Sequence, residues 1–281
     1  MNLSQDFQFN QANLQDFVDC RRRFLLRHLK RLAWPAIETD PVLERERYLQ
    51  QGAAFHRLAQ QYLLGIPPQY LSNLVNDPTL ERWWQNFTAF AAEIKEGQNL
   101  LGWKLYPEMS LSAPLAGSRI LAKYDLVAVS PQGTLSIYDW KTARIRSRRE
   151  WLETRLQTRV YPYLLARAGA HLNSGKPIQP EQIEMIYWFS EYPEQSERFA
   201  YNPAAFQADE NYLTALVETI QRLQEEEFYL TSDEKRCGFC TYRSLCNRGL
   251  TASSIEDQEL PTQDQFQEVL VDFEQIAEIE F

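Results

Sequence analysis

The chain has 281 residues, of which 44% are hydrophobic, and its formal net charge at pH 7 is −9. This length suits one large domain or two small ones, and the hydrophobic content is sufficient for a sizeable core. No apolar run approaches about 18 residues, and the N-terminus lacks both a basic start and an apolar segment, so we predict neither a membrane span nor a secretory signal. We therefore expect a cytoplasmic protein.

The negative charge is concentrated at the end of the sequence. Residues 255–281 contain nine acidic residues and no Lys or Arg, which leaves 29 acidic and 29 basic residues in the rest of the chain. Residues 251–265 are mostly polar and predict a linker, and residues 263–281 space their apolar side chains like an amphipathic helix. We expect this acidic tail, residues 251–281, to pack on its own domain, to cover a basic face, or to bind a protein partner.

Three helical patterns come first in the chain. Apolar residues at helical spacing predict helices over residues 10–33, 43–64 and 78–96. The first contains Cys20, and the second contains His56. A single histidine on a helix is more often a structural residue than a metal ligand, so His56 alone predicts no site.

A β-hairpin follows the first predicted strand, which begins near Leu101. Two runs rich in β-branched and aromatic residues flank the turn Ser130–Gly133. If the loop consists of residues 131–133, Asp125 lies opposite Asp139, with their Cβ atoms about 5 Å apart. Because side chains alternate along a strand, Lys141 shares the face of Asp139, and Trp140 points the other way.

This pattern places two carboxylates and a lysine on one face of the hairpin. We expect the neighbours on that face to be apolar, namely Leu121, Val127, Val129, Leu135 and Ile137. Two carboxylates in such surroundings do not both stay ionised without a cation, and Mg²⁺ prefers oxygen ligands of this kind. The lysine would orient or deprotonate a water molecule, or stabilise charge on a phosphate. The alternatives are a solvent-facing hairpin with ordinary charges, or an internal ion pair.

The remaining elements complete an alternation of strands and helices. Residues 150–168 predict a helix on which Gln157 and Tyr161 share one face. Residues 183–189 predict a further strand, and residues 208–228 a further helix. The fold class we expect is α/β, a sandwich with a mixed sheet and an N-terminal helical section.

Three of the four cysteines form a C-x2-C-x5-C cluster near the C-terminus: Cys237, Cys240 and Cys246. Cys20 is far away in sequence. Disulfides are not expected in an intracellular protein, and four thiolates suit either zinc or an iron–sulfur cluster. Four unrelated buried thiols are the remaining interpretation.

Asp125, the triplet Asp139-Trp140-Lys141 and the pair Gln157 and Tyr161 together resemble the motifs of the PD-(D/E)XK nuclease superfamily, in its RecB-like branch. The resemblance implies a restriction-endonuclease-like core, with a mixed central sheet flanked by helices. It also implies that Asp125, Asp139, the Trp140 carbonyl and His56 hold Mg²⁺ or Mn²⁺, and that Lys141 acts on water. By the same resemblance, Gln157 and Tyr161 position the strand to be cut.

The cysteines extend this resemblance. In iron–sulfur RecB-like nucleases, which include CRISPR-associated enzymes and AddB-type helicase–nuclease subunits, one cysteine precedes the nuclease motifs and three follow them. Cys20, Cys237, Cys240 and Cys246 match that order, which implies a 4Fe–4S cluster, with zinc as the alternative. The implied nuclease domain covers residues 1–250, with a helical section (10–96), a core (101–228) and a cysteine knuckle (237–246).

The activity implied is that of a metal-dependent deoxyribonuclease, an exonuclease on single-stranded DNA or duplex ends in DNA repair, recombination or CRISPR-type processing. Two other hypotheses are a non-cleaving iron–sulfur DNA-binding subunit, and a subunit whose acidic tail binds a helicase. The sequence has no G-x-x-x-x-G-K-[S/T] motif, so an unwinding motor would be another chain. We expect phosphate contacts from a basic cluster comprising Lys141, Arg144, Arg146, Arg148, Arg149, Arg155 and Arg159.

Overall fold

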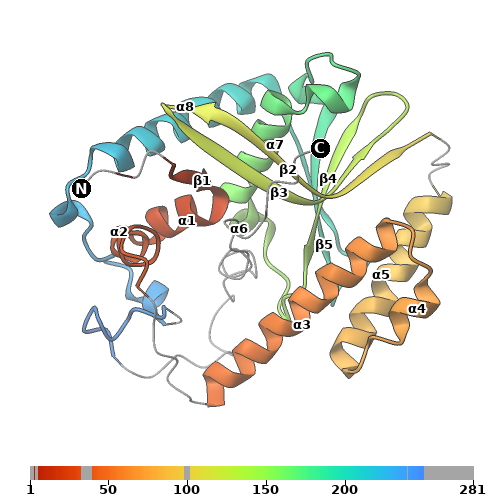
Figure 1. Cartoon of the computed structure of the whole chain (residues 1–281), viewed down its shortest axis with the longest axis horizontal. Coiled ribbons are helices and arrows are strands. Elements are labelled where there is room, and N and C mark those ends of the chain that lie inside the picture. The colour runs from red at the N-terminus through yellow and green to blue at the C-terminus, as the bar shows by residue number, and fades with distance from the viewer. Residues whose placement is uncertain (1–2, 4–5, 33–39, 98–101, 239, 250–281) are drawn as a thin grey trace.

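A mixed β-sheet forms the centre of the computed structural model, which describes residues 3, 6–32, 40–97, 102–238 and 240–249 (Figure 1). Strand β3 is antiparallel to both β2 and β4 and parallel to β1. Strand β5 is parallel to β4 and antiparallel to β6. The six strands are β1 (Gln8–Asn10), β2 (Lys104–Leu115), β3 (Ser118–Val129), β4 (Leu135–Lys141), β5 (Ile183–Phe189) and β6 (Glu197–Ala200).

The predicted register of the hairpin β3–β4 is confirmed. Val129 pairs with Leu135, and the N–H of Ser130 donates to the carbonyl of Thr134 at 2.8 Å. Gly133 has a φ of 86°, a conformation that glycine adopts without steric cost and that closes the short loop. The last pair of the ladder is Leu126 with Tyr138, and the same register continued by one residue sets Asp125 opposite Asp139.

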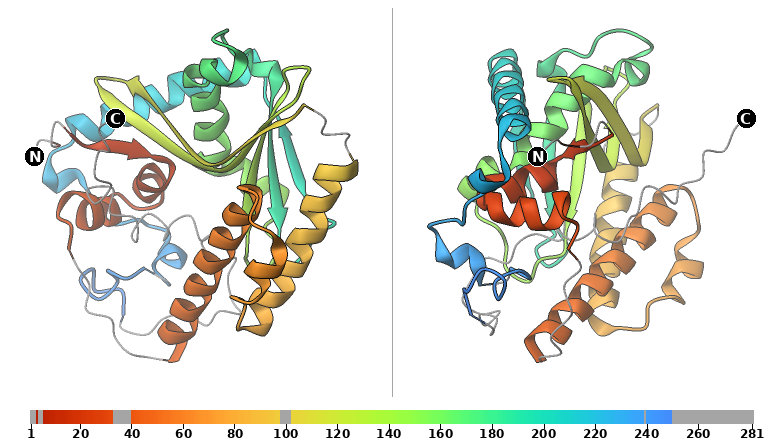
Figure 2. Two further views of the ribbon diagram at one scale, coloured as in Figure 1. Left: turned by 45° about the vertical axis from the view of Figure 1, so that its right-hand side comes forward. Right: turned by 60° about the vertical axis from the view of Figure 1, so that its left-hand side comes forward.

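Helices cover both faces of the sheet, so the molecule has three layers (Figure 2). This agrees with the α/β fold predicted above, a mixed central sheet flanked by helices. One face carries α3 (Asp40–Leu63), α4 (Pro68–Ser72) and α5 (Pro78–Gly97), and the other carries α1 (Gln11–Asp19), α7 (Leu156–Ala168) and α8 (Pro203–Arg222).

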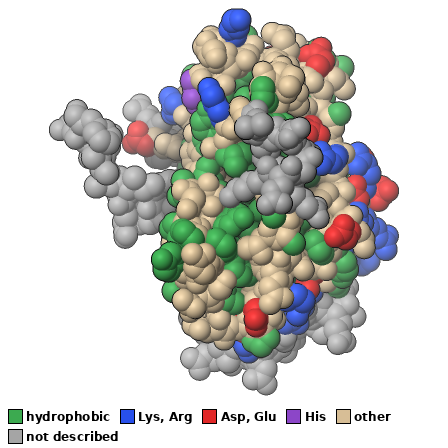
Figure 3. All heavy atoms as spheres, turned by 90° about the vertical axis from the view of Figure 1, so that its right-hand side faces the viewer, with side chains coloured by type: hydrophobic (Ala, Val, Ile, Leu, Met, Phe, Trp, Pro, Cys, Tyr) green, Lys and Arg blue, Asp and Glu red, His purple; other side chains and the backbone are tan. Residues whose placement is uncertain are grey.

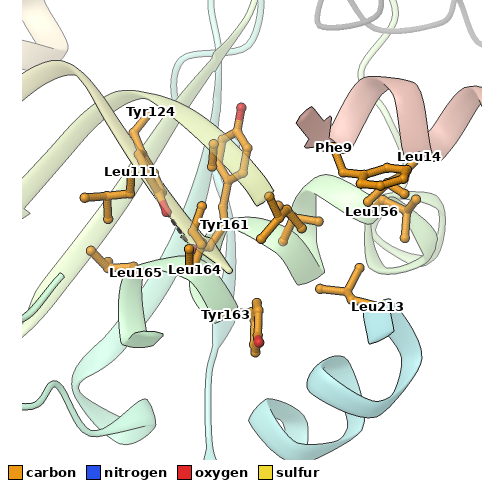
Figure 4. Packing of buried hydrophobic residues seen from close by; sticks show 14 of the residues in the cluster. Phe9, Leu14, Leu111, Tyr124, Leu156, Tyr161, Tyr163, Leu164, Leu165 and Leu213 are labelled. Atoms are coloured by element: carbon orange, nitrogen blue, oxygen red, sulfur yellow. Dashed lines mark hydrogen bonds between the residues drawn. The ribbon is translucent and has the colours of Figure 1, made fainter. Parts of the chain in front are cut away.

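Each face of the sheet has its own hydrophobic core. On the α3–α5 side, Trp140 and Trp188 from the strands pack against helical aromatics such as Phe87. On the opposite side, Leu156 of α7 packs near Phe9 and residues of α1 (Figure 4). Burial of apolar and aromatic side chains on both faces stabilises this arrangement. Hydrophobic side chains are also exposed on the face of the molecule that Figure 3 shows.

Several predicted element boundaries are wrong. The helix expected over residues 10–33 is interrupted at Cys20, whose backbone is extended, and continues as α2 (Arg21–Phe24) and a π-helical turn (Leu25–Leu29). The helix expected over residues 150–168 is divided at Arg155 into α6 (Arg149–Thr154) and α7. Strands β1 and β6 and helix α4 were not predicted, and α8 starts and ends earlier than expected.

The acidic tail, residues 251–281, lies outside the described residues, so its predicted linker and helix stay predictions. Within the described part of the chain, no helix is both long enough and apolar enough to span a membrane.

Candidate active site and metal centre

Asp125 of β3 connects two other parts of the site. Its Oδ1 lies 3.1 Å from Nδ1 of His56, a buried residue of α3. Its Oδ2 accepts the backbone N–H of Trp140 in β4 at 2.7 Å. The helical section and both strands of the hairpin therefore meet at this one carboxylate.

Glu108 of β2 lies beside Asp125. Its neighbours pair as Pro107 with Leu126 and Met109 with Tyr124, so the register sets Glu108 opposite Asp125. Glu108 has a φ of 54°, in the left-handed region, which costs a non-glycine residue on the order of 1–2 kcal/mol. Backbone strain of this kind is concentrated at functional sites.

Opposite the irregular backbone at Glu108, the alternation of side chains between the two faces of the sheet is interrupted in β3. Tyr124 and Ala122 point into the same hydrophobic core as Val127 and Val129, although simple alternation would put them on opposite faces. Leu121, predicted to share the face of Asp139, is instead outside that core and half-buried. The prediction failed because it assumed unbroken alternation through Asp125.

His56, Glu108 and Asp125 form a candidate metal site, because one ligand atom from each lies within 4.8 Å of the others. Nε2 of His56 is buried and has no hydrogen-bond partner among the described residues. A buried polar atom without a partner is unfavourable, whereas imidazole nitrogen and carboxylate oxygen are both normal ligands of divalent cations. The residues present therefore fit a divalent metal ion.

The electrostatics of the three residues agree with this fit. Burial opposes ionisation of Asp125, but His56 and the Trp140 N–H outweigh it, so the pKa of Asp125 is lowered. Burial and the charge of Asp125 together raise the pKa of Glu108. Burial also disfavours the charged form of His56, but Asp125, Glu108 and Asp139 raise its pKa to about 9. The raised pKa values of His56 and Glu108 mean that protons offset the negative charge of the site. A bound cation would offset the same charge.

Asp139 and Lys141 of β4 form the second half of the site. Nζ of Lys141 lies 2.7 Å from Oδ2 of Asp139, and both side chains are almost fully buried. Gln157 of α7 bridges them, because its Nε2 donates to Oδ1 of Asp139 at 2.5 Å and its Oε1 accepts from Lys141 at 2.8 Å. The ring of Tyr187 in β5 lies 5.2 Å from Nζ of Lys141. The lysine is thus held in one position by three neighbours.

The structure brings five of the predicted site residues together in two contact groups, which the hairpin β3–β4 joins. One group is His56 with Asp125, and the other is Asp139, Lys141 and Gln157. The Trp140 side chain packs on the opposite face of the sheet, as expected, with its ring 5.3 Å from that of Phe87. The ring of Tyr161 lies 4.9 Å from that of Tyr124 in a tilted arrangement, and its backbone carbonyl accepts from the Tyr124 hydroxyl at 3.0 Å (Figure 4).

Glu108 was not predicted as a ligand, although the sequence contains a signal for it. Ala116 and Gly117 both have positive φ and form a two-residue turn between Leu115 and Ser118. Counting back from such a turn places Glu108 opposite Asp125.

The model of the PD-(D/E)XK nuclease superfamily matches residues 8–247 of the sequence. The chain belongs to the PD-(D/E)XK nuclease superfamily. Membership in this superfamily implies a metal-dependent nuclease, in agreement with the candidate metal site described above.

Two solved structures are similar to this PD-(D/E)XK protein. One is the crystal structure of SSO0001, with 14% sequence identity, a TM-score of 0.42, and coverage of 89% of this chain and 90% of that one. The other is the crystal structure named "Putative exonuclease" from Eubacterium rectale, with 12% identity, a TM-score of 0.49 and the same coverages. Among curated proteins, none matches the sequence significantly.

The four cysteines of this superfamily member are all free and partly buried. Burial raises the pKa of the Cys237 thiol, and the proximity of Cys240, Cys20 and Cys246 raises it further. The fold therefore brings Cys20 into electrostatic range of the C-terminal cysteines.

The expected phosphate-binding cluster is largely engaged in internal contacts. Arg146 and Arg149 both pair with Glu197, and Arg159 pairs with Asp209 at 2.9 Å. The sequence analysis predicted phosphate contacts for these arginines and did not foresee their acidic partners, which lie far away in sequence. In the nuclease fold, these ion pairs connect β6 to the residues that follow β4, and α8 to α7.

Proposed function

We propose that the protein hydrolyses phosphodiester bonds of DNA with the help of Mg²⁺ or Mn²⁺. The observation that carries this proposal is the buried group formed by Asp139, Lys141 and Gln157, next to the candidate metal site around Asp125. A cation and two carboxylates from one short hairpin converge there with an amide from α7, in a member of a nuclease superfamily.

In this proposal, His56, Asp125, Asp139 and the Trp140 carbonyl hold the metal, and Glu108 is an additional ligand. When bound, the metal supplies positive charge that offsets the carboxylates and stabilises negative charge developing on the phosphate. The contacts between His56 and Asp125, and between Asp125 and the Trp140 N–H, support these assignments because they fix the ligand oxygens in place.

As an ammonium group, Lys141 orients the attacking water or stabilises the charge that forms on the phosphate; only in its neutral form would it take up the proton of the water. Its fixed position favours this role, because a side chain that is already ordered loses little entropy when the reaction begins. Gln157 holds Lys141 and Asp139 at their separation. Tyr161, one helical turn further along α7, positions the strand that is cut.

We place the protein in the RecB-like branch of the superfamily and assign residues 1–250 to one nuclease domain, with a 4Fe–4S cluster held by Cys20, Cys237, Cys240 and Cys246. The mutual effect of the thiols on the pKa of Cys237 supports a shared ligand set. The substrate proposed is single-stranded DNA or a duplex end, cut by an exonuclease in the cytoplasm during repair, recombination or CRISPR-type processing. A helicase is the partner proposed for the acidic tail.

The experiment uses full-length protein purified without oxygen and three labelled DNAs: linear single strands, circular single strands and blunt duplexes. Cleavage of linear single strands with Mg²⁺ or Mn²⁺, and its absence with a chelator, is the expected result. Circles that stay intact indicate an exonuclease. Failure to cut any of the three DNAs with either metal would contradict the proposal.

A further inference from the structure

The N-terminus of α7 is capped by a residue from α1, near the N-terminus of the chain. The N-cap residue of α7, Arg155, makes no side-chain capping bond. Instead the first N–H of the helix, that of Leu156, donates to Oε1 of Gln15 at 3.0 Å, and this bond is buried. Helix α1 therefore supplies the acceptor that α7 lacks locally.

The side chain of Gln15 is itself held in place. Its Nε2 donates to Oδ1 of Asp19 at 2.9 Å, one turn further along α1. An amide that donates at one end and accepts at the other has a fixed orientation, so its acceptor stays directed at Leu156. Both Gln15 and Asp19 are buried, where such a bond has few competitors from water.

Asp19 connects this bond to the segments that carry the cysteines. Its carboxylate pairs with Arg23 at 2.9 Å and with Arg236, and Arg155 lies 3.9 Å away. Asp19 directly precedes Cys20, and Arg236 directly precedes Cys237. The two cysteine-bearing segments thus meet at the same carboxylate that fixes Gln15.

The other end of this path lies in the candidate active site. Gln157 follows Leu156 in the chain and contacts both Asp139 and Lys141. A shift of the first turn of α7 therefore moves Gln157 relative to those two residues. Because catalysis depends on exact placement, a displacement of about 1 Å is enough to lower a rate by up to about 100-fold.

We propose that Gln15 is a positioning residue for Gln157, and that Asp19 and Arg236 make this position depend on the cysteine segment. The inference rests on the proposed nuclease function only for its effect on catalysis. The structural part stands apart from it, because it concerns the protection of the Leu156 amide.

The test compares three full-length variants by amide hydrogen exchange and by steady-state DNA cleavage. Gln15→Leu removes both the acceptor and the donor, and Gln15→Glu keeps an acceptor oxygen but replaces the donor to Asp19 with a like charge. Gln11→Leu changes a similarly buried glutamine on the same helix and serves as the matched control. We expect Gln15→Leu to speed exchange at Leu156 by about tenfold and to lower kcat with KM unchanged. We expect Gln15→Glu to protect the Leu156 amide better than Gln15→Leu does, and Gln11→Leu to change neither the exchange nor kcat.

A second pair of variants tests the link to the cysteine segment. Arg236→Met removes the contact with Asp19, and Lys235→Met alters the neighbouring side chain. We expect only Arg236→Met to raise exchange at Leu156, and to do so without loss of the metal or cluster bound by the cysteines.

Two results would overturn the inference: normal exchange and kcat in Gln15→Leu, or equal losses in Gln11→Leu. Unaltered exchange in Arg236→Met would remove the link to the cysteines. If the wild-type protein cuts no DNA while the exchange results hold, the proposed function fails and the positioning of α7 by Gln15 stands.

Discussion

Oδ2 of Asp125 accepts the backbone N–H of Trp140 at 2.7 Å, so a carboxylate of one strand is fastened to the backbone of the next. The bond leaves Oδ1 directed at His56. Asp125 therefore has a structural partner and a candidate metal-binding oxygen at the same time, and the two roles are separable by substitution.

Asp125→Asn should weaken metal binding much more than it weakens the fold. The amide oxygen of asparagine still accepts the Trp140 N–H, but the negative charge is lost. Asp125→Ala leaves that N–H unsatisfied and should cost about 1–3 kcal/mol of unfolding free energy as well. Urea unfolding and calorimetric titration with Mn²⁺ measure the two effects. Equal Mn²⁺ affinity in Asp125→Asn and wild type would contradict the assignment of Asp125 as a ligand.

Glu108→Gly should stabilise the metal-free protein while weakening its affinity for Mn²⁺. Glycine relieves the left-handed backbone at a φ of 54°, a gain of about 1 kcal/mol, and also removes a carboxylate that faces Asp125. Ala116→Gly, at a φ of 48° in the β2–β3 turn, is the matched control. It should give a similar gain with unchanged Mn²⁺ affinity. A Glu108→Gly variant that binds Mn²⁺ like the wild type would show that Glu108 is not a ligand.

Asp16→Asn should destabilise the protein by about 3 kcal/mol, because it leaves a buried group of cations without their carboxylate. Asp16 pairs with Arg23 at 2.7 Å and with Arg27 and His28 at 2.9 Å. Burial opposes its ionisation, but these partners hold the pKa of Asp16 well below its usual range.

The sign of the pH dependence follows from that lowered pKa. The contribution of Asp16 is complete above the unfolded-state pKa, about 3.9, and is lost as the pH falls further toward the folded-state value. The difference in urea midpoint between wild type and Asp16→Asn should therefore be constant from pH 7 to pH 5 and shrink below about pH 4. Asp6→Asn, at an exposed position, is the control. A difference that shrinks between pH 7 and pH 5 would contradict this account of Asp16.

Cys20→Ser should lose bound iron and unfolding free energy together, because in such sites the free energy of metal binding is part of the free energy of folding. Anaerobically purified wild type should contain iron and inorganic sulfide and show visible absorption. Thr241→Ser, at an exposed position between Cys240 and Cys246, should keep both. Stoichiometric zinc without iron in the wild type would refute the cluster.

Sequence patterns predicted the parts of this site that depend on local structure. The turn at Ser130–Gly133 is short and contains a glycine, so the opposition of Asp125 and Asp139 followed from counting residues. The spacing of Asp139 and Lys141, two apart in one strand, likewise predicted their shared face. These relationships are set within about 17 residues, where chain geometry leaves few alternatives.

Contacts between distant segments were not predictable in the same way. Nothing near Arg159 or Arg146 in sequence indicated that Asp209 and Glu197 would neutralise them. The extended backbone at Cys20 and Arg155 interrupts runs with good helical periodicity, because tertiary contacts override local propensity there. The bond from Leu156 to Gln15 spans 141 residues and has no local signature.

The central claim is that the buried group around Lys141 catalyses metal-dependent cleavage of DNA. Single-turnover cleavage of end-labelled single-stranded DNA by Lys141→Met, with Lys104→Met as the control, tests it most directly. We predict a rate at least about 100-fold below that of the wild type for Lys141→Met, with an unchanged circular dichroism spectrum, and a wild-type rate for Lys104→Met. A folded Lys141→Met protein that cleaves DNA at the wild-type rate would contradict the claim.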